Sequence, residues 1–357
     1  MSKSIHRTLG ITLACSLAIG AALPGFSAQD VTAMVEKASN LMNAGKAKPA
    51  AELLREAIRL NPDDAKAHAQ LGAALAAQVE KDDYEDAIHE EQQALKLDPK
   101  SFVARIILGH IYANMQKSAE AIAILKEAVE VKPTSYGAHR DLGIAYLSAG
   151  KADESIAAFK KALEIKSDAK DAADIHCKLA VLLSKKGRTQ EAISEANQLV
   201  ELAPKDAESH VVLGNILLES GDDAGSVEPF KDALKIIKNH PNALSGLGWA
   251  QRKEDAAEAV ADQQKAIKAD PRFLPAYVRL GDLYADQNKT AEAEAQFKTA
   301  LKLSPNDAGV GTSYAKFLAK TDRKDEAVSA LKKVIAKSPQ YKPAADALAG
   351  LQQPKSK

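Results

Sequence analysis

One feature of the sequence limits the fold more than any other: a small residue returns at a period close to 34 residues. The steps between successive members are 34, 37, 34, 37, 34, 34, 33 and 34 residues. The series consists of Ala38, Gly72, Gly109, Gly143, Ala180, Gly214, Gly248, Gly281 and Ala315. A fixed period of this length indicates a repeat array, in which each repeat packs only against its neighbours. A chain of 357 residues is also too long for one ordinary compact core.

Each period contains two further small residues and, in most cases, a closing proline. The second small residue, usually twelve positions after the first, is found at Ala50, Ala87, Ala121, Ser155, Ala192, Ser226, Ala259, Ala293 and Ala327. The third, usually seven positions later, is found at Ala57, Ala94, Ala128, Ala162, Ala233, Ala266 and Ala300. Proline closes seven of the nine periods, at Pro62, Pro99, Pro133, Pro204, Pro271, Pro305 and Pro339.

These spacings predict two helices in every period. Gly143 and Tyr146 share one face of a first helix, and Ser155, Phe159 and Ala162 share one face of a second. Gly150 between them ends the first helix and turns the chain. Two antiparallel helices joined by so short a turn must pack together, and small residues at the crossing allow a close approach. Strand patterns are absent and aromatic residues make up only 4% of the chain, which favours an all-α core of alanine and leucine.

This pattern resembles the tetratricopeptide repeat, and the resemblance extends from Val31 to about Leu351. It implies an all-α, right-handed solenoid of about nine helix pairs, followed by a capping helix and charged tail at 342–357. The expected repeats are 31–64, 65–101, 102–135, 136–172, 173–206, 207–240, 241–273, 274–307 and 308–341. Some repeats depart from the pattern. Repeats four and six lack the proline, Leu199 and Val334 replace the third alanine, and extra residues occur near 78–83 and 167–172.

The first 28 residues predict a secretory signal peptide. Lys3 and Arg7 give a positive start, an apolar run extends from Leu9 to Leu23, and small residues precede Gln29. The run is shorter than the roughly 20 residues that a membrane-spanning helix needs. We therefore expect an exported, periplasmic or otherwise extracytoplasmic protein without membrane insertion after cleavage. Two alternatives remain open: an uncleaved signal anchor, and a lipoprotein modified at Cys15. The mature chain keeps only Cys177, which we expect to be a half-buried helix residue.

Charge and motifs argue against several classes of function. The chain has 48 basic and 48 acidic residues, so no net charge favours nucleic acid. Phosphate-loop, nucleophile-elbow and His-Glu-x-x-His patterns are absent, so we expect no enzyme activity and no cofactor. His68, His139, His176 and His210 recur four residues before the small residue. One histidine per repeat places the rings too far apart to share a metal ion, so we interpret them as packing residues.

The resemblance also implies where a partner would bind. In this family ligands usually lie in a groove lined by the first helix of each pair. We assign the groove to two positions in each repeat, one residue after the first small residue and three residues before it. The candidate binding residues at these positions, with two cations next to Trp249, are His110, Arg140, Asn215, Trp249, Arg252, Lys253, Asp282 and Lys316.

Trp249 is the only tryptophan, and a tryptophan beside Arg252 and Lys253 suits an extended peptide or a glycan. The alternative is that its ring fills a gap in repeat seven, which is one residue short. The expected function is a non-catalytic scaffold that binds a protein segment in envelope assembly, secretion or polysaccharide export. A periplasmic accessory protein that binds a small molecule or a glycan is the alternative. The partner's identity and the oligomeric state are not encoded in these patterns.

Overall fold

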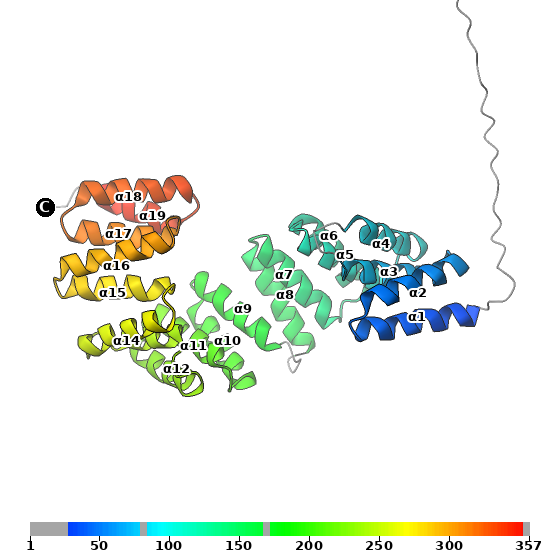
Figure 1. Cartoon of the computed structure of the whole chain (residues 1–357), viewed down its shortest axis with the longest axis horizontal. Coiled ribbons are helices and arrows are strands. Elements are labelled where there is room, and N and C mark those ends of the chain that lie inside the picture. The colour runs from blue at the N-terminus through cyan, green and yellow to red at the C-terminus, as the bar shows by residue number, and fades with distance from the viewer. Residues whose placement is uncertain (1–27, 79–83, 167–171, 353–357) are drawn as a thin grey trace, which may run out of the picture. The chain divides into compact units, whose positions relative to one another are not determined.

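The computed structural model describes residues 28–78, 84–166 and 172–352, and every regular element in these ranges is an α-helix. Nineteen helices follow one another in chain order (Figure 1). The all-α solenoid predicted from the period is confirmed, because α1 to α18 pack as nine consecutive pairs and α19 follows the last pair. The signal peptide and both predicted insertions lie mainly or wholly outside the described residues.

The chain divides after Ile165 into two compact units. The helices of the first unit are α1 (Ala28–Asn43), α2 (Ala47–Leu60), α3 (Ala65–Ala76), α4 (Glu85–Leu97), α5 (Phe102–Asn114), α6 (Ser118–Val131), α7 (Tyr136–Ser148) and α8 (Ala152–Ile165). Within this unit each helix packs against the next one in the chain, and the first helix of each pair also contacts the first helix of the next pair.

The second unit repeats this arrangement. Its helices are α9 (Ala172–Lys185), α10 (Thr189–Leu202), α11 (Ala207–Glu219), α12 (Asp223–Ile236), α13 (Pro241–Ala250), α14 (Ala256–Ala269), α15 (Leu274–Asp286), α16 (Thr290–Leu303), α17 (Ala308–Lys320), α18 (Lys324–Lys337) and α19 (Lys342–Gln352). The helix α19 packs against α17 and α18, where it buries Ala344 against the last repeat. A terminal helix of this kind covers the apolar side that a last repeat would otherwise expose.

Repeat four shows why the first small residue recurs. Phe159 of α8 is fully buried against Gly143 of α7. A Cβ atom at position 143 would lie 2.5 Å from the Cδ1 atom of Phe159, which is closer than real Cβ atoms come to other atoms. The Ser155 hydroxyl donates a hydrogen bond of 2.8 Å to the Gly143 carbonyl at the same crossing. The loss of helix propensity at Gly143 is therefore offset by a close crossing with a fully buried ring.

The side chain that meets the small residue differs among repeats. Leu125 packs on Gly109, Phe230 on Gly214 and Phe297 on Gly281, and all three side chains are buried. In repeat two the corresponding residue is Glu91, which is fully buried with both carboxyl oxygens lacking a hydrogen-bond partner among the described residues. Burial, together with the charge of Glu90, raises the pKa of Glu91 to about 9.

The turns between paired helices use a left-handed residue, as the position of Gly150 predicted. Gly150 has a φ of 70°, and α8 begins two residues later. Three repeats place Gln116, Asn288 or Asp322 in the same conformation. Proline, in contrast, is not needed to end the second helix. The helix α12 ends at Ile236 although Lys238 stands where other repeats have proline, and the Ile237 N–H donates to the Ala233 carbonyl at 2.8 Å.

Candidate binding site

One residue in each of four consecutive repeats defines a surface of the second unit. The first helices α11, α13, α15 and α17 pack on one another in that order. The residue after the first small residue in these helices is Asn215, Trp249, Asp282 or Lys316. These four residues are partly buried or exposed, in contrast with the buried small residue before each. We call the surface that they form the first-helix face.

Trp249 is half-buried, and a cation lies over its ring. The Arg252 guanidinium is 4.6 Å from the indole centroid, which is within the range of a cation–π interaction. Arg252 also donates to the Trp249 carbonyl at 2.6 Å and pairs with Asp223 of α12 at 3.2 Å. Lys253 binds the same Asp223 carboxylate at 2.8 Å. Both predicted cations are thus bonded to Asp223 of α12. They lower the pKa of Asp223, and the hydrogen bond from Lys253 makes the largest contribution.

A second arginine, which the sequence analysis did not identify, lies beside the same ring. The guanidinium of Arg279 is 5.9 Å from the Trp249 centroid and donates to the Ser245 hydroxyl at 3.0 Å. Burial, followed by the charge of Arg252, lowers the pKa of Arg279 to about 10, so the side chain stays charged at neutral pH. No carboxylate forms an ion pair with Arg279 in the part of the chain that the structure describes.

Arg279 could have been found from its register. It stands two residues before Gly281, between Ala276 and Leu280, which are both buried. Asp141 holds the equivalent position before Gly143 and was missed for the same reason. A charged residue that interrupts a buried helix face is a signal of a polar network.

The charge on the first-helix face changes sign along α15 and α17. Asp282 is half-buried, and this burial, with the neighbouring charge of Asp286, raises its pKa to about 6. Lys316 is exposed, and Lys320 one turn later forms an ion pair with Asp286. Asn215 at the other end donates to the Asn242 side chain at 3.4 Å, a long hydrogen bond. The first-helix face and the residues next to it therefore combine an aromatic ring, two arginines, a lysine and acidic groups.

His110 and Arg140 belong to the first unit, where they converge on one buried carboxylate. The His110 Nε2 atom is 2.8 Å from one Asp141 oxygen, and the Arg140 guanidinium is 2.9 Å from the other. Asp141 is 7% exposed, so its contacts with His110 and Arg140 offset the loss of hydration that burial would otherwise impose on the carboxylate. The sequence analysis assigned His110 and Arg140 to a groove; in the structure both side chains are at least partly exposed and both contact Asp141.

Three of the predicted groove positions in the second unit are buried and so cannot line a groove. Val211, Ser245 and Thr312 stand three residues before the first small residue and are 0%, 0% and 3% exposed. They are buried because consecutive first helices pack against one another along this line. Ser245 instead donates from its hydroxyl to the Gln263 side chain at 2.7 Å. The residues that follow the small residue in α11, α13, α15 and α17 are, in contrast, partly buried or exposed.

The recurring histidines have structural partners. The rings of His68, His139 and His210 bond through Nε2 to the carbonyls of Pro62, Pro133 and Pro204 at 3.0, 2.9 and 3.0 Å. Those of His68 and His176 also contact Glu90 and Glu195 through Nδ1, each at 2.6 Å. Each ring therefore joins its helix to the preceding turn or to the paired helix. Within the described ranges, no group of three or more potential ligands could hold a metal ion.

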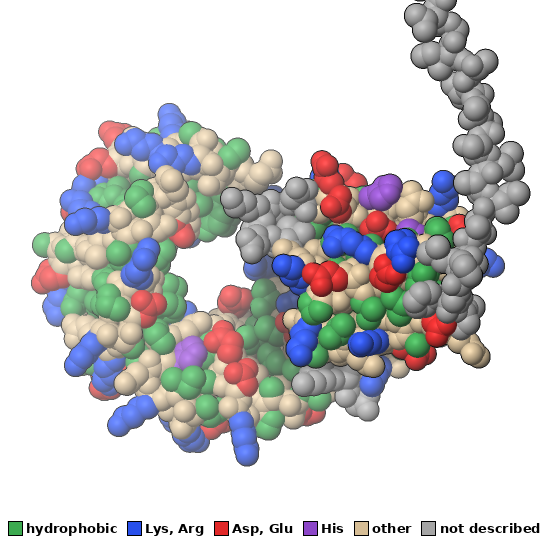
Figure 2. Space-filling view, turned by 45° about the vertical axis from the view of Figure 1, so that its right-hand side comes forward, with side chains coloured by type: hydrophobic (Ala, Val, Ile, Leu, Met, Phe, Trp, Pro, Cys, Tyr) green, Lys and Arg blue, Asp and Glu red, His purple; other side chains and the backbone are tan. Residues whose placement is uncertain are grey.

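The surface of each unit carries both signs of charge, with apolar side chains between them (Figure 2). Cys177 is half-buried, as expected, and burial raises the pKa of its thiol. None of the helices in the described ranges is long and apolar enough to cross a lipid bilayer.

Two family models described as tetratricopeptide repeat match the chain. One matches residues 35–102 and 108–172, and the other matches residues 146–216 and 285–351. Together they cover more than half of the sequence and agree with the helix pairs described above. The chain belongs to the tetratricopeptide repeat family. Proteins of this family generally mediate protein–protein interactions.

The curated relatives match over less than a fifth of their own length. The heat shock protein sti1 homolog of Schizosaccharomyces pombe is 38% identical over 77 residues, which is 21% of this chain and 13% of that protein. Human tetratricopeptide repeat protein 16 is 25% identical over 146 residues, which is 37% of this chain and 17% of that protein. A solved tetratricopeptide repeat protein from Parabacteroides merdae has a TM-score of 0.63 at 19% identity, covering 71% of this chain and 100% of its own, and so shares the fold.

Proposed function

We propose that this chain is a non-catalytic, exported scaffold that binds a segment of another protein on the first-helix face of its second unit. The observation that carries the proposal is the arrangement around Trp249. Among the described residues, Arg279 makes one side-chain hydrogen bond, to Ser245, although its guanidinium has five N–H donors. An indole beside a partly buried cation with unused donors suits a protein segment that offers an apolar side chain and a carbonyl or carboxylate group.

A protein segment fits this face better than a glycan does. Sugars usually bind on the open face of an aromatic ring, whereas the Arg252 guanidinium lies 4.6 Å from the Trp249 centroid. Arg252 is also bonded to the Trp249 carbonyl and to Asp223, so a sugar that stacked on this side of the ring would have to displace it from two partners. The alternation of Asp282 and Lys316 along the same face further favours a segment that carries charges of both signs.

The substitution Trp249→Ala tests this proposal. Partners would be captured from an envelope extract with the full mature chain and identified, and the affinity of the best partner would be measured. We expect Trp249→Ala to weaken that affinity by about 30-fold or more, as at an interface hot spot, with an unchanged helical signal. Phe102→Ala in the first unit is a matched control, since Phe102 also lies under a cation, Lys132, at 5.4 Å.

Two outcomes would contradict the proposal. In one, Trp249→Ala lowers the melting temperature and leaves the affinity per folded molecule unchanged, which would make the ring a packing residue. In the other, Phe102→Ala weakens binding as much as Trp249→Ala does, which would place the interface elsewhere.

Export is a separate part of the proposal and has its own test. We expect N-terminal sequencing of the mature protein to find a start between about residues 26 and 30, in keeping with signal-peptide cleavage. A mature protein that begins at Met1 would contradict export. Lipid attached to Cys15 would instead identify an anchored lipoprotein.

A further inference from the structure

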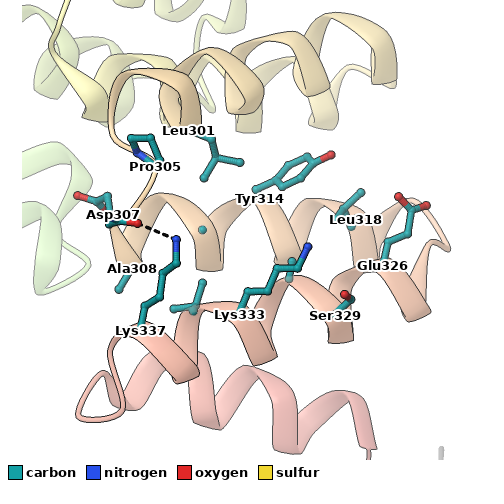
Figure 3. Close-up of a pocket in the computed structure, with 14 residues that line it drawn as sticks. Leu301, Pro305, Asp307, Ala308, Tyr314, Leu318, Glu326, Ser329, Lys333 and Lys337 are labelled. Carbon is teal, nitrogen blue, oxygen red and sulfur yellow. Dashed lines mark hydrogen bonds between the residues drawn. The ribbon is translucent and has the colours of Figure 1, made fainter.

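A pocket of about 410 Å³ opens between α16, α17 and α18, in the last repeats of the second unit. Figure 3 shows Leu301 of α16 and Tyr314 and Leu318 of α17 on one side, with Lys333 and Lys337 of α18 reaching across from the other. None of the residues of the first-helix face lines it. The pocket is therefore a second feature, independent of the surface around Trp249.

The pocket lies at a place where one bulky residue of the repeat is missing. The position four residues before the first small residue is held, from repeat one to repeat eight, by Met34, His68, Arg105, His139, His176, His210, Leu244 and Tyr277. In repeat nine it is Gly311, which lines the pocket. A Cβ atom at Gly311 would lie 2.6 Å from the Cγ2 atom of Val334, the residue that replaces the third alanine in this repeat. Gly311 and Val334 thus depart from the repeat pattern together.

The other repeats show what the missing side chain does. In five of them the side chain at this position donates a hydrogen bond to the carbonyl of the proline six residues earlier. The donors are His68, Arg105, His139, His210 and Tyr277. The hydroxyl of Tyr277, in the repeat next to the pocket, donates to the Pro271 carbonyl at 3.0 Å. The equivalent carbonyl in repeat nine belongs to Pro305, which lines the pocket, and no described side chain donates to it.

The walls of the pocket define the chemistry of an occupant. Leu301, Leu318 and Val334 supply apolar surface. Of the polar groups, the Tyr314 hydroxyl already donates to Glu294 at 2.9 Å and the Lys337 amine to Asn306 at 2.7 Å. Lys333 has no ion-pair partner within the described ranges and is thus left to attract an anionic group.

We propose that this pocket binds a tyrosine side chain from a partner protein segment that carries a carboxylate close to the tyrosine. The ring occupies the pocket that Gly311 and Val334 line, its hydroxyl donates to the Pro305 carbonyl, and the carboxylate pairs with Lys333. The arrangement reproduces, between two molecules, the bond that Tyr277 makes to Pro271 within this chain. It goes beyond the function proposed above, because it adds a second contact point that does not involve Trp249.

The test uses small probes and the full mature chain. Binding of 4-hydroxyphenylacetate would be followed by NMR chemical-shift changes and compared with 4-methoxyphenylacetate, in which the donor is blocked, and with p-cresol, which lacks the carboxylate. We expect blocking the hydroxyl to weaken binding by about fivefold or more, the value of one hydrogen bond. Equal binding of the hydroxyl and methoxy probes to the unmodified chain would overturn the proposal.

Two variants locate the site. The double change Gly311→His with Val334→Ala copies the pair His139 and Ala162 of repeat four, so it should fold and abolish binding of all three probes. Lys333→Gln should weaken the binding of 4-hydroxyphenylacetate by about threefold or more and leave the binding of p-cresol unchanged. Probe binding that survives the double change in a folded protein, or that is lost in Trp249→Ala, would place the site elsewhere and overturn the proposal.

Discussion

Repeats two and four cross their helices at the same small residue but place opposite kinds of side chain against it. In repeat four the ring of Phe159 is fully buried on Gly143. In repeat two the equivalent residue, Glu91, is equally buried on Gly72, and its carboxyl group has no hydrogen-bond partner in the described ranges. Both repeats form the same pair of helices, so the small residue sets the backbone geometry.

The difference between the two repeats is therefore energetic. A buried ring contributes apolar contact area, whereas a buried carboxyl group loses its hydration without compensation. Each repeat of a solenoid depends mainly on its neighbours, so such a difference stays local. Stability should consequently vary along the chain although the backbone pattern does not. The predictions below test this comparison, from the largest expected effect to the smallest.

Phe159→Ala should have the largest effect. It should lower the free energy of unfolding by about 3–5 kcal/mol, because a cavity forms at a fully buried position. Hydrogen exchange should rise first around α7 and α8, and Phe102→Ala, at a partly buried position, should cost clearly less. Uniform loss of protection over both units would contradict the local picture.

Glu91→Leu should act in the opposite direction. Removing an unpaired buried carboxyl group should stabilise the first unit by about 1–3 kcal/mol. The pH dependence gives a sharper test. The folded pKa of about 9 lies above the ordinary glutamate pKa of 4.5, so the folded state binds more protons between these values. Stability of the natural chain should therefore fall as pH rises from about 4.5 to about 9.

Chemical denaturation across this pH range would measure the effect, with Glu91→Gln as the matched control. Glu91→Gln keeps the size of the side chain and removes its titration, so it should lack the contribution from residue 91. If the stability of the natural chain and that of the Glu91→Gln variant changed in parallel with pH, Glu91 would not titrate in this range.

Gly143→Ala should cost about 1–3 kcal/mol by overpacking, since the added Cβ atom would lie 2.5 Å from the Phe159 ring. Gly137 lies in the same helix, and a Cβ atom there meets nothing within 4 Å. Gly137→Ala should accordingly be neutral or up to about 1 kcal/mol stabilising. Thermal unfolding of the two variants would separate the effect of overpacking at the helix crossing from the effect of helix propensity. Equal changes in melting temperature would reject the close-approach explanation.

Ser155→Ala should have the smallest effect, a loss of about 1 kcal/mol for one buried hydrogen bond to the Gly143 carbonyl. Ser226 in α12 is the control, because its hydroxyl donates to the Asp223 carbonyl within its own helix. Ser226→Ala should cost less, since it breaks no contact between helices. The denaturant midpoints of the two variants would measure this difference. A lower midpoint for Ser226→Ala than for Ser155→Ala would contradict the prediction.

The candidate site was harder to predict than the fold. Trp249 follows Gly248 and could be placed on a surface from register alone. Arg279 and Asp141 were missed because they lie on a face that the sequence pattern marks as buried, and only their partners explain them. Arg252 was expected to be available for a ligand, yet its guanidinium lies over Trp249 and pairs with Asp223 of another helix. Sequence spacing within one repeat carries no information on such contacts between elements.

The sequence by itself determined the family, the all-α solenoid and the position of each helix crossing, because a residue without a large side chain is required wherever two backbones approach closely. The tertiary structure decided what stands opposite each small residue, which polar groups find partners and where a cavity opens. Glu91 and Gly311 stand at regular positions of the repeat, and only their surroundings show that one is a buried carboxyl group without a partner among the described residues and that the other lines a pocket. Those outcomes depend on side chains from neighbouring helices, and packing between elements, unlike a period, is not written in local sequence.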